Sequence, residues 1–144
     1  MLRITARAPI KPTEDAVRVV KGVAALFPDA TVTQSDTDVS ATGGSLERLR
    51  ELVRAQRIPD TARGAMLSGL SDDGTLARFL LGKQAAAVGR AHFGPLRSPL
   101  GDVEVTIEGD SPGEVERAIY KCAPDTTVPI ELSEIPLSQR PSAE

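Results

Sequence analysis

The stretch DVEVTIEGDSPGEVERAI, residues 102–119, contains the clearest change of pattern in the chain. In its first half, Val103, Val105 and Ile107 alternate with polar residues, which predicts a strand with one buried face. Its second half opens on SPGE, residues 111–114, where serine, proline and glutamate have the spacing of a capping box. We therefore expect a strand followed directly by a helix.

The N-terminal residues repeat this order of strand and helix with a different sequence. Residues 2–8 alternate apolar side chains with polar ones that include Arg3 and Arg7, which predicts another half-buried strand. Thr13 is expected to cap a helix that ends at Pro28. Two such units predict a split β-α-β arrangement in an α+β fold, with a mostly antiparallel sheet and helices packed on one face. If the strand in residues 2–8 lies beside the strand in residues 102–108, the arginines of the first strand lie opposite the glutamates of the second.

The segment between these units is predicted to supply the remaining elements. Their expected order is a hairpin in residues 29–44, helices in residues 46–57 and from Asp60 onward, a strand in residues 75–81 and a short helix in residues 83–90. The hairpin is short, β-branched and polar, with its turn at residues 35–38. Ser45 is expected to cap the first of the two helices, and Pro59 separates them.

Length and composition indicate one globular domain with a tail. The chain has 144 residues, of which 40% are hydrophobic and 26% are charged, and this is enough for a single core. After Pro124 the sequence contains several prolines and little periodicity. We therefore expect one domain over residues 1–124 and an extended tail over residues 125–144.

Cysteine usage and hydropathy exclude several classes of protein. The single cysteine, Cys122, cannot form an internal disulfide, and no spacing of Cys and His suits zinc. Arginines interrupt the apolar patch at the N-terminus, unlike in a signal peptide, and no apolar run reaches the length of a membrane-spanning helix. We expect a cytoplasmic protein without metal or cofactor, in which Cys122 acts as a small buried hydrophobe.

Positive charge gathers in one part of the sequence. The net charge of the chain is -3, yet residues 74–101 contain Arg78, Lys83, Arg90 and Arg97 and no acidic residue. These four cations are the candidate contacts for a nucleic acid or another anion. Two features weigh against RNA: the chain has only three phenylalanines and one tyrosine for stacking on bases, and its C-terminal third is strongly acidic.

Gly82 and Lys83 raise the question of a phosphate-binding P-loop. Such a loop needs a glycine where Ala77 stands and a serine or threonine where Gln84 stands, so a P-loop is excluded. A looser anion site at the start of the short helix that follows stays open.

The predicted helix in residues 46–57 carries a basic stripe. Arg50, Arg54 and Arg57 recur at helical spacing, and two glutamates of the same helix are close enough to neutralise part of their charge. This balance favours a solvated or intersubunit face over a phosphate-binding surface, and these three arginines are the candidate interface residues.

The sequence contains no recognisable set of catalytic residues. His92, the only histidine, has no serine, cysteine or carboxylate partner at a recognisable spacing. An enzyme that acts on a phosphorylated metabolite would need Lys83 and His92 to share one pocket. That arrangement is a hypothesis that the fold can decide.

Three stretches, in this order, carry a resemblance to a known family: SLERLRELVRAQRIPDTARGAML, GKQAAAVGRAHF and SPLGDVEVTIEGD. Together they resemble an archaea-specific family of uncharacterised proteins with no assigned activity, over residues 1–124. The conjunction of QRIPDTAR with KQAAAVGR is the specific part of the match. The chain departs from the family at Gly82, where a polar side chain such as asparagine is expected, and in the tail after Pro124.

The resemblance has implications for fold and partners. It implies an α+β domain similar in shape to a large-subunit ribosomal protein and to other RNA-binding domains, usually paired as a homodimer. Some relatives join this domain to a nucleotide-kinase-like P-loop domain, so the resemblance implies such a protein as a partner. It transfers no catalytic, cofactor-binding or metal-ligating residue.

The function favoured at this point is a non-enzymatic homodimeric interaction domain with an RNA-binding-like fold. The alternative is an RNA or ribonucleoprotein binder that uses the basic segment of residues 74–101.

Overall fold

The computed structural model describes residues 2–94 and 101–124, so Arg97 and the predicted tail over residues 125–144 lie outside the described residues. The elements follow the order β1 (Arg3–Pro9), α1 (Ala16–Leu26), β2 (Ala30–Gln34), β3 (Asp38–Gly43), α2 (Glu47–Gln56), α3 (Pro59–Ser68), β4 (Leu76–Leu81), α4 (Lys83–Ala87), β5 (Phe93–Gly94), β6 (Val103–Glu108) and α5 (Glu114–Cys122). The predicted hairpin, helix pair, strand and short helix of the middle segment are all present.

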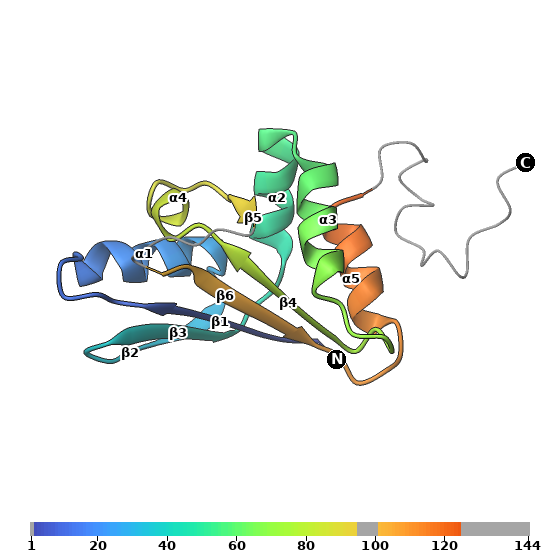
Figure 1. Ribbon diagram of the computed structural model, residues 1–144, viewed down its shortest axis with the longest axis horizontal. Coiled ribbons are helices and arrows are strands. Elements are labelled where there is room, and N and C mark those ends of the chain that lie inside the picture. Colours follow the sequence, from blue (N-terminus) through green and yellow to red (C-terminus); the bar gives the residue numbers. More distant parts are fainter. Residues whose placement is uncertain (1, 95–100, 125–144) are drawn as a thin grey trace, which may run out of the picture.

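The strands form one sheet, and the helices cover one of its faces (Figure 1). Within the described residues the sheet has six strands in the order β2-β3-β1-β6-β4-β5, and every neighbouring pair is antiparallel. α1 connects β1 to β2, and β3 lies antiparallel between these two strands. They are therefore parallel to each other, as in the predicted split β-α-β unit. The α+β prediction is confirmed, while the likeness to a ribosomal protein stays a prediction.

The register of β1 against β6 confirms that the two predicted strands are neighbours. Arg3 lies opposite Glu108 and Arg7 lies opposite Glu104. Arg3 is 3.7 Å from the Glu108 carboxylate, but Arg7 pairs with Asp38 of β3 on its other side, at 2.5 Å. The predicted charge match therefore holds for one of the two arginines, because a carboxylate on the opposite neighbour captures the other.

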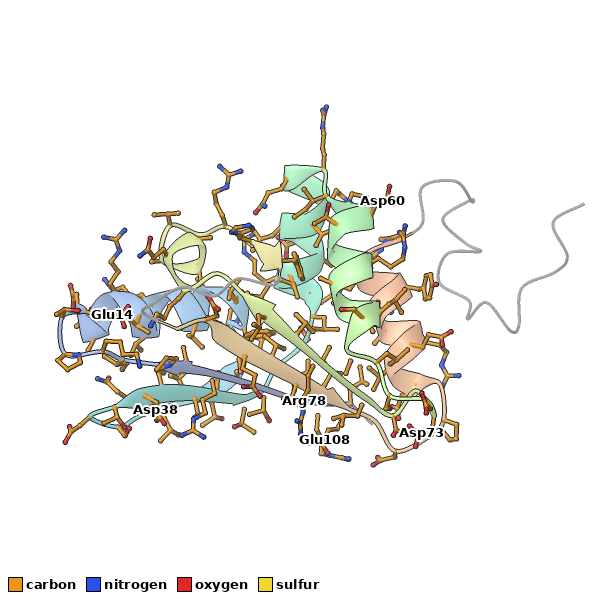
Figure 2. All side chains as sticks on the ribbon, in the orientation of Figure 1. Glu14, Asp38, Asp60, Asp73, Arg78 and Glu108 are labelled. Carbon is orange, nitrogen blue, oxygen red and sulfur yellow. The ribbon has the colours of Figure 1, made fainter. Side chains whose placement is uncertain are left out.

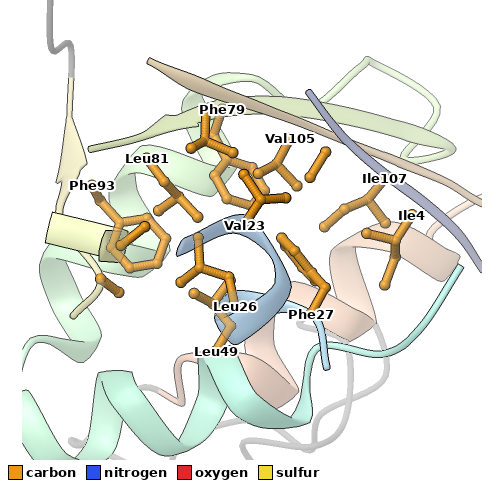
Figure 3. Close-up of a cluster of buried hydrophobic side chains, with 14 of the residues drawn as sticks. Ile4, Val23, Leu26, Phe27, Leu49, Phe79, Leu81, Phe93, Val105 and Ile107 are labelled. Atoms are coloured by element: carbon orange, nitrogen blue, oxygen red, sulfur yellow. The ribbon is translucent and has the colours of Figure 1, made fainter. Parts of the chain in front are cut away.

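The core lies between the helices and the inner face of the sheet (Figure 3). The largest side chains that are almost wholly buried come from most of the elements: Leu26, Phe27, Leu49, Met66, Leu81, Ile107 and Ile119. Phe79 of β4 stacks on Phe93 of β5 with ring centroids 5.9 Å apart. This stacking ties the short strand β5 to the sheet and fixes the loop that leads into it.

The predicted start of the first helix at Thr13 is wrong. α1 begins at Ala16, and Asp15 is its N-cap because the Asp15 carboxylate accepts a hydrogen bond from the Val17 N–H at 3.0 Å. Glu14 therefore precedes the helix instead of lying in its first turn, and its carboxylate is available to another part of the fold.

The predicted capping box before α5 is present in part. The Glu114 carboxylate accepts hydrogen bonds from the N–H groups of Asp110 and Ser111, at 2.7 and 3.2 Å. The helix itself begins at Glu114, since Gly113 has a φ of 78° that is left-handed and not helical. Pro112 consequently belongs to the preceding turn and not to the first position of the helix.

Candidate functional site

Of the four cations predicted to contact an anion, the three that the structure describes do not lie together. Arg78 occupies an outward position of β4 and points away from the helices (Figure 2). Lys83 begins α4 on the helical side and is buried. Arg90 is exposed in the loop between α4 and β5, and Arg97 is outside the described residues. Because β4 alternates its side chains between two faces while α4 packs on one, cations that are close in sequence are separated by the sheet.

The Lys83 ammonium is bound inside the protein. Its Nζ lies 2.7 Å from Glu14 Oε1 and donates a hydrogen bond to the Pro9 carbonyl oxygen at 2.8 Å. The side chains of Lys83 and Glu14 are only 3% and 10% exposed. α4 can approach this closely because Gly22 of α1 lacks a side chain, and a Cβ there would lie 2.9 Å from the Ala87 nitrogen. Lys83 therefore joins α4 to the segment between β1 and α1.

The Glu14 carboxylate is held in its charged form. Burial pushes the pKa of Glu14 upward, but hydrogen bonds from the Lys83 ammonium and the Lys11 N–H, together with the charge of both lysines, outweigh that effect. The pKa of Glu14 therefore lies below its ordinary value. At neutral pH this contact is an internal ion pair and not an anion site open to solvent.

Lys83 and His92 border different hollows of the described structure. Lys83 lies in a hollow with Glu14 and Arg18, whereas His92 lies in another with Gln56 and Arg90. The two residues are nevertheless close along the backbone, since the His92 carbonyl accepts a hydrogen bond from the Gly82 N–H at 2.8 Å. Neither of these two hollows is lined by both residues, so they give no support to the hypothesis of a phosphoryl enzyme.

Gln56, the last residue of α2, holds the loop that precedes β5. Its Nε2 donates a hydrogen bond to the Ala91 carbonyl at 2.7 Å, and its Oε1 accepts one from the Ala91 N–H at 2.8 Å. Arg90 and His92 flank Ala91, so this clamp places both at a hollow of about 320 Å³. Sequence reasoning missed Gln56 because no local pattern connects a helix-terminal glutamine to a loop 35 residues away.

The three candidate interface arginines follow one side of α2. Arg54 and Arg57 are exposed, while Arg50 is half-buried beside a hollow between α2 and α5. Glu51, which was expected to neutralise this stripe, pairs with Arg48 at 3.2 Å. The exposed end of the stripe is therefore a small cationic surface.

The outer face of the sheet carries balanced charge. Its ionisable residues at outward strand positions are Arg3, Arg7, Asp38, Arg78, Glu104 and Glu108. Arg78 lies opposite Thr106 of β6, so the glutamates two residues away on that strand are its diagonal neighbours. Figure 2 shows Arg78 and Glu108 on the side of the sheet away from the helices. This face therefore lacks the excess of positive charge that a nucleic-acid groove requires.

Aromatic stacking and cysteine chemistry do not add a site. The aromatic residues of the chain are at most 7% exposed: Phe27, Phe79, Phe93 and Tyr120. Stacking on unpaired bases needs exposed rings. Burial raises the pKa of the Cys122 thiol to about 12, with Arg50 opposing the shift and Glu47 adding to it, and the expectation that Cys122 is buried is confirmed.

The described residues contain neither a candidate metal cluster nor a helix that could span a membrane. In residues 2–94 and 101–124, no cluster of three or more His, Cys, Asp or Glu side chains is placed to hold a metal ion. None of the helices in that part of the chain is long and apolar enough to cross a membrane.

Among the described residues, no hydrogen-bond partner is found for the outward backbone groups of the edge strand β2. The Ser35 N–H donates a hydrogen bond to the Asp38 carbonyl at 2.8 Å, and hydrogen-bonded pairs alternate along an antiparallel ladder. Thr33 therefore bonds toward β3, while the N–H and C=O groups of Val32 and Gln34 point away from the sheet. The β2 sequence, ATVTQ, contains no charge and no proline, so it lacks the usual protection of an exposed edge.

Several known proteins are similar in sequence to this chain, although no family model matches it. A UPF0201 protein of Methanosarcina acetivorans is 34% identical over 94% of this chain and 92% of its own length. A UPF0201 protein of Methanothermobacter thermautotrophicus is 34% identical over 93% of this chain and 100% of its own length. A UPF0200/UPF0201 protein of Archaeoglobus fulgidus is 39% identical over 74% of this chain, which amounts to 32% of that longer protein.

Solved structures share its fold. The crystal structure of an uncharacterized UPF0201 protein has a TM-score of 0.77 and 34% identity, covering 88% of this chain and 97% of its own. A UPF0201 protein from Methanococcus jannaschii has a TM-score of 0.77 and 32% identity, with coverage of 86% and 94%. None of these relatives has an assigned activity. The family resemblance of the three quoted stretches is thus confirmed, and the chain belongs to the archaeal UPF0201 family.

Proposed function

We propose that this protein is a non-enzymatic homodimeric interaction domain, and that two copies join through the free edge of β2. The observation that carries the proposal is the outward direction of the Val32 and Gln34 backbone groups on an edge without charge or proline. Unpaired strand edges attract other strands, so an edge that no strand of the described residues covers favours association.

The edge of β2 is self-complementary. If two copies of β2 pair antiparallel about a two-fold axis at Val32, each Val32 N–H donates to the partner's Val32 carbonyl. The Gln34 N–H then faces the partner's Ala30 carbonyl. The opposite edge of the described sheet is β5, which has only two residues, so β2 offers the longer pairing surface.

The stripe on α2 is less suitable for pairing with itself. Contact between two copies of this surface would bring Arg54 and Arg57 close to the same arginines of the other copy, and like charges in an interface oppose association. The stripe instead suits an acidic partner. Arg50, Arg54 and Arg57 therefore remain candidate interface residues for a different protein.

Proline at position 32 tests the β2 edge selectively. Val32→Pro removes the outward N–H without removing a bond to β3, and Val32→Ala is the matched control that loses the side chain but keeps the N–H. Sedimentation velocity should find a dimer for the natural protein and for Val32→Ala, and a monomer for Val32→Pro. Gln34→Pro, at an exposed position with an outward N–H, gives a second variant if Val32→Pro fails to fold.

Two results would contradict this proposal. A natural protein that sediments as a monomer at about 100 μM, where even a weak dimer of micromolar Kd is populated, would remove the homodimer. A dimer that survives both proline variants but dissociates in Arg54→Glu/Arg57→Glu would move the interface to α2.

A P-loop protein of the nucleotide-kinase type is proposed as a second partner. Its support is the longer Archaeoglobus fulgidus relative, whose name joins UPF0200 to UPF0201 and of which this chain spans 32%. Co-elution of this chain with a separately expressed UPF0200 protein would support the proposal, and separate elution at tens of micromolar would contradict it. The RNA-binding alternative is not proposed, because its described cations lie in separate places and the aromatic residues are buried.

A further inference from the structure

We propose that the hollow between the end of α2, the start of α3 and the loop before β5 binds a small organic phosphate. In this site Arg90 and His92 hold the phosphate group, and Ile58 and Phe93 contact the apolar part of the ligand. The site is independent of the β2 edge and does not rest on the proposed dimer.

The loop that carries Arg90 and His92 is held in place by hydrogen bonds to the rest of the protein. Gln56 binds both the N–H and the C=O of Ala91, at 2.8 and 2.7 Å. The Arg90 N–H donates to the Ala85 carbonyl at 2.9 Å, so the residues on both sides of the clamp have a defined backbone. A ligand site gains affinity when its groups are already in place, because less conformational entropy is lost on binding.

The lining has the charge that an anion requires. Arg90 and His92 are exposed at the hollow, and the eight residues that line it include no carboxylate. The nearest acidic residue along α3 is Asp60, whose carboxylate is paired with Arg63 at 2.6 Å. Within residues 2–94 and 101–124, no ion pair is found for either Arg90 or His92. An anion would therefore meet the guanidinium of Arg90 and the imidazole of His92 without a competing carboxylate in the lining.

The shape and polarity of the hollow indicate a phosphate on an apolar body. Its volume of about 320 Å³ lies at the lower end of the range for small-molecule sites. The planar guanidinium of arginine suits the oxygens of phosphate, and the Thr61 hydroxyl in the lining can donate a further hydrogen bond. The rest of the lining includes the apolar residues Ile58, Ala85 and Phe93. Inorganic phosphate alone would not contact this apolar part, whereas an organic phosphate can.

The single histidine of the chain gives a direct readout. In proton NMR of the full-length protein, the imidazole signals come from His92 alone. Phenyl phosphate is the probe, and inorganic phosphate tests the need for the apolar part. Arg90→Gln removes the proposed ligand, while Arg78→Gln is the matched control, since it removes an exposed arginine from the opposite side of the sheet.

The expected result is a saturable movement of the His92 signals with phenyl phosphate and weaker binding of inorganic phosphate. Arg90→Gln should raise the Kd for phenyl phosphate about tenfold or more, the loss expected for one charged hydrogen-bonding partner. Arg78→Gln should leave the Kd unchanged. The proposal is overturned if millimolar phenyl phosphate does not move the signals, if both phosphates bind equally, or if the two arginine variants weaken binding alike.

Discussion

Replacing Lys83 with methionine should destabilise the fold strongly, although Lys83 belongs to a segment that looks like an anion-binding surface in the sequence. Methionine has a similar length but no charge and no hydrogen-bond donor. The substitution removes the lysine contacts of the Glu14 carboxylate and the Pro9 carbonyl, which are 2.7 and 2.8 Å long. Because the Glu14 side chain is only 10% exposed, water replaces those contacts incompletely.

The size of the effect follows from the geometry of the pair. Removing one partner of a buried ion pair costs about 3–5 kcal/mol. Glu14 keeps a hydrogen bond from the Lys11 N–H at 2.9 Å, which places Lys83→Met at the lower end, about 3 kcal/mol of unfolding free energy. Adding Glu14→Gln removes the uncompensated charge, so the double variant should recover about 1–2 kcal/mol.

Urea denaturation of the natural protein, both single variants and the double variant measures this coupling as a thermodynamic cycle. Arg78→Met is the control, because it removes an exposed cation of the same sequence segment, and it should change stability by less than about 0.5 kcal/mol. A loss below about 1 kcal/mol for Lys83→Met, or a double variant less stable than Lys83→Met, would refute the structural role of the pair.

The remaining predictions concern pH, packing and thiol reactivity. Because the pKa of Glu14 is lowered in the folded state, the ionised carboxylate stabilises the fold fully above about pH 4.3, and this contribution is lost on further acidification. The difference in unfolding free energy between the natural protein and Glu14→Gln should therefore shrink toward pH 3, and a constant difference contradicts this. A Cβ at Gly69 would overlap the Arg78 carbonyl oxygen, whereas one at Gly64 meets nothing within 4 Å. In thermal denaturation, Gly69→Ala should therefore cost about 3 kcal/mol or more and Gly64→Ala should gain about 0.5–1 kcal/mol; the reverse order argues against this packing. Cys122 is 2% exposed and should react with a thiol reagent at pH 8 only after denaturant is added, so rapid labelling of the native protein would count against its burial.

The elements of this fold could be predicted where a local pattern marks them. The alternation in residues 103–108 and the polar turn at residues 35–38 appear in the structure as β6 and the β2–β3 hairpin. The split β-α-β unit could also be predicted, since it follows from two strand-helix units. The predicted cap at Thr13 was wrong because Asp15, two residues later, is also able to cap a helix, and the backbone decides which residue does so.

The candidate sites could not be predicted, because their contacts join distant parts of the chain. Lys83 and Glu14 are 69 residues apart, and Gln56 and Ala91 are 35 residues apart. In the sequence, Glu14 suits a helix start and Gln56 suits an exposed helix end. Their actual roles depend on where α1 and α4 pack and on the path of the loop before β5, which no periodicity describes.

A run of cations in a sequence does not by itself form a cationic surface, because the fold can place neighbouring cations on different faces of the protein or pair them internally. β4 places Arg78 diagonally between two glutamates of β6, and the charge of Lys83 is matched internally by Glu14. Among the described cations of residues 74–101, Arg90 alone is exposed on the helical side. One phosphate contact contributes only about 0.9 to the slope of the logarithm of the binding constant against the logarithm of the salt concentration. Several contacts give a much steeper slope. The described part of this segment is therefore suited to holding a single phosphate group, beside His92, and not to following a nucleic-acid backbone.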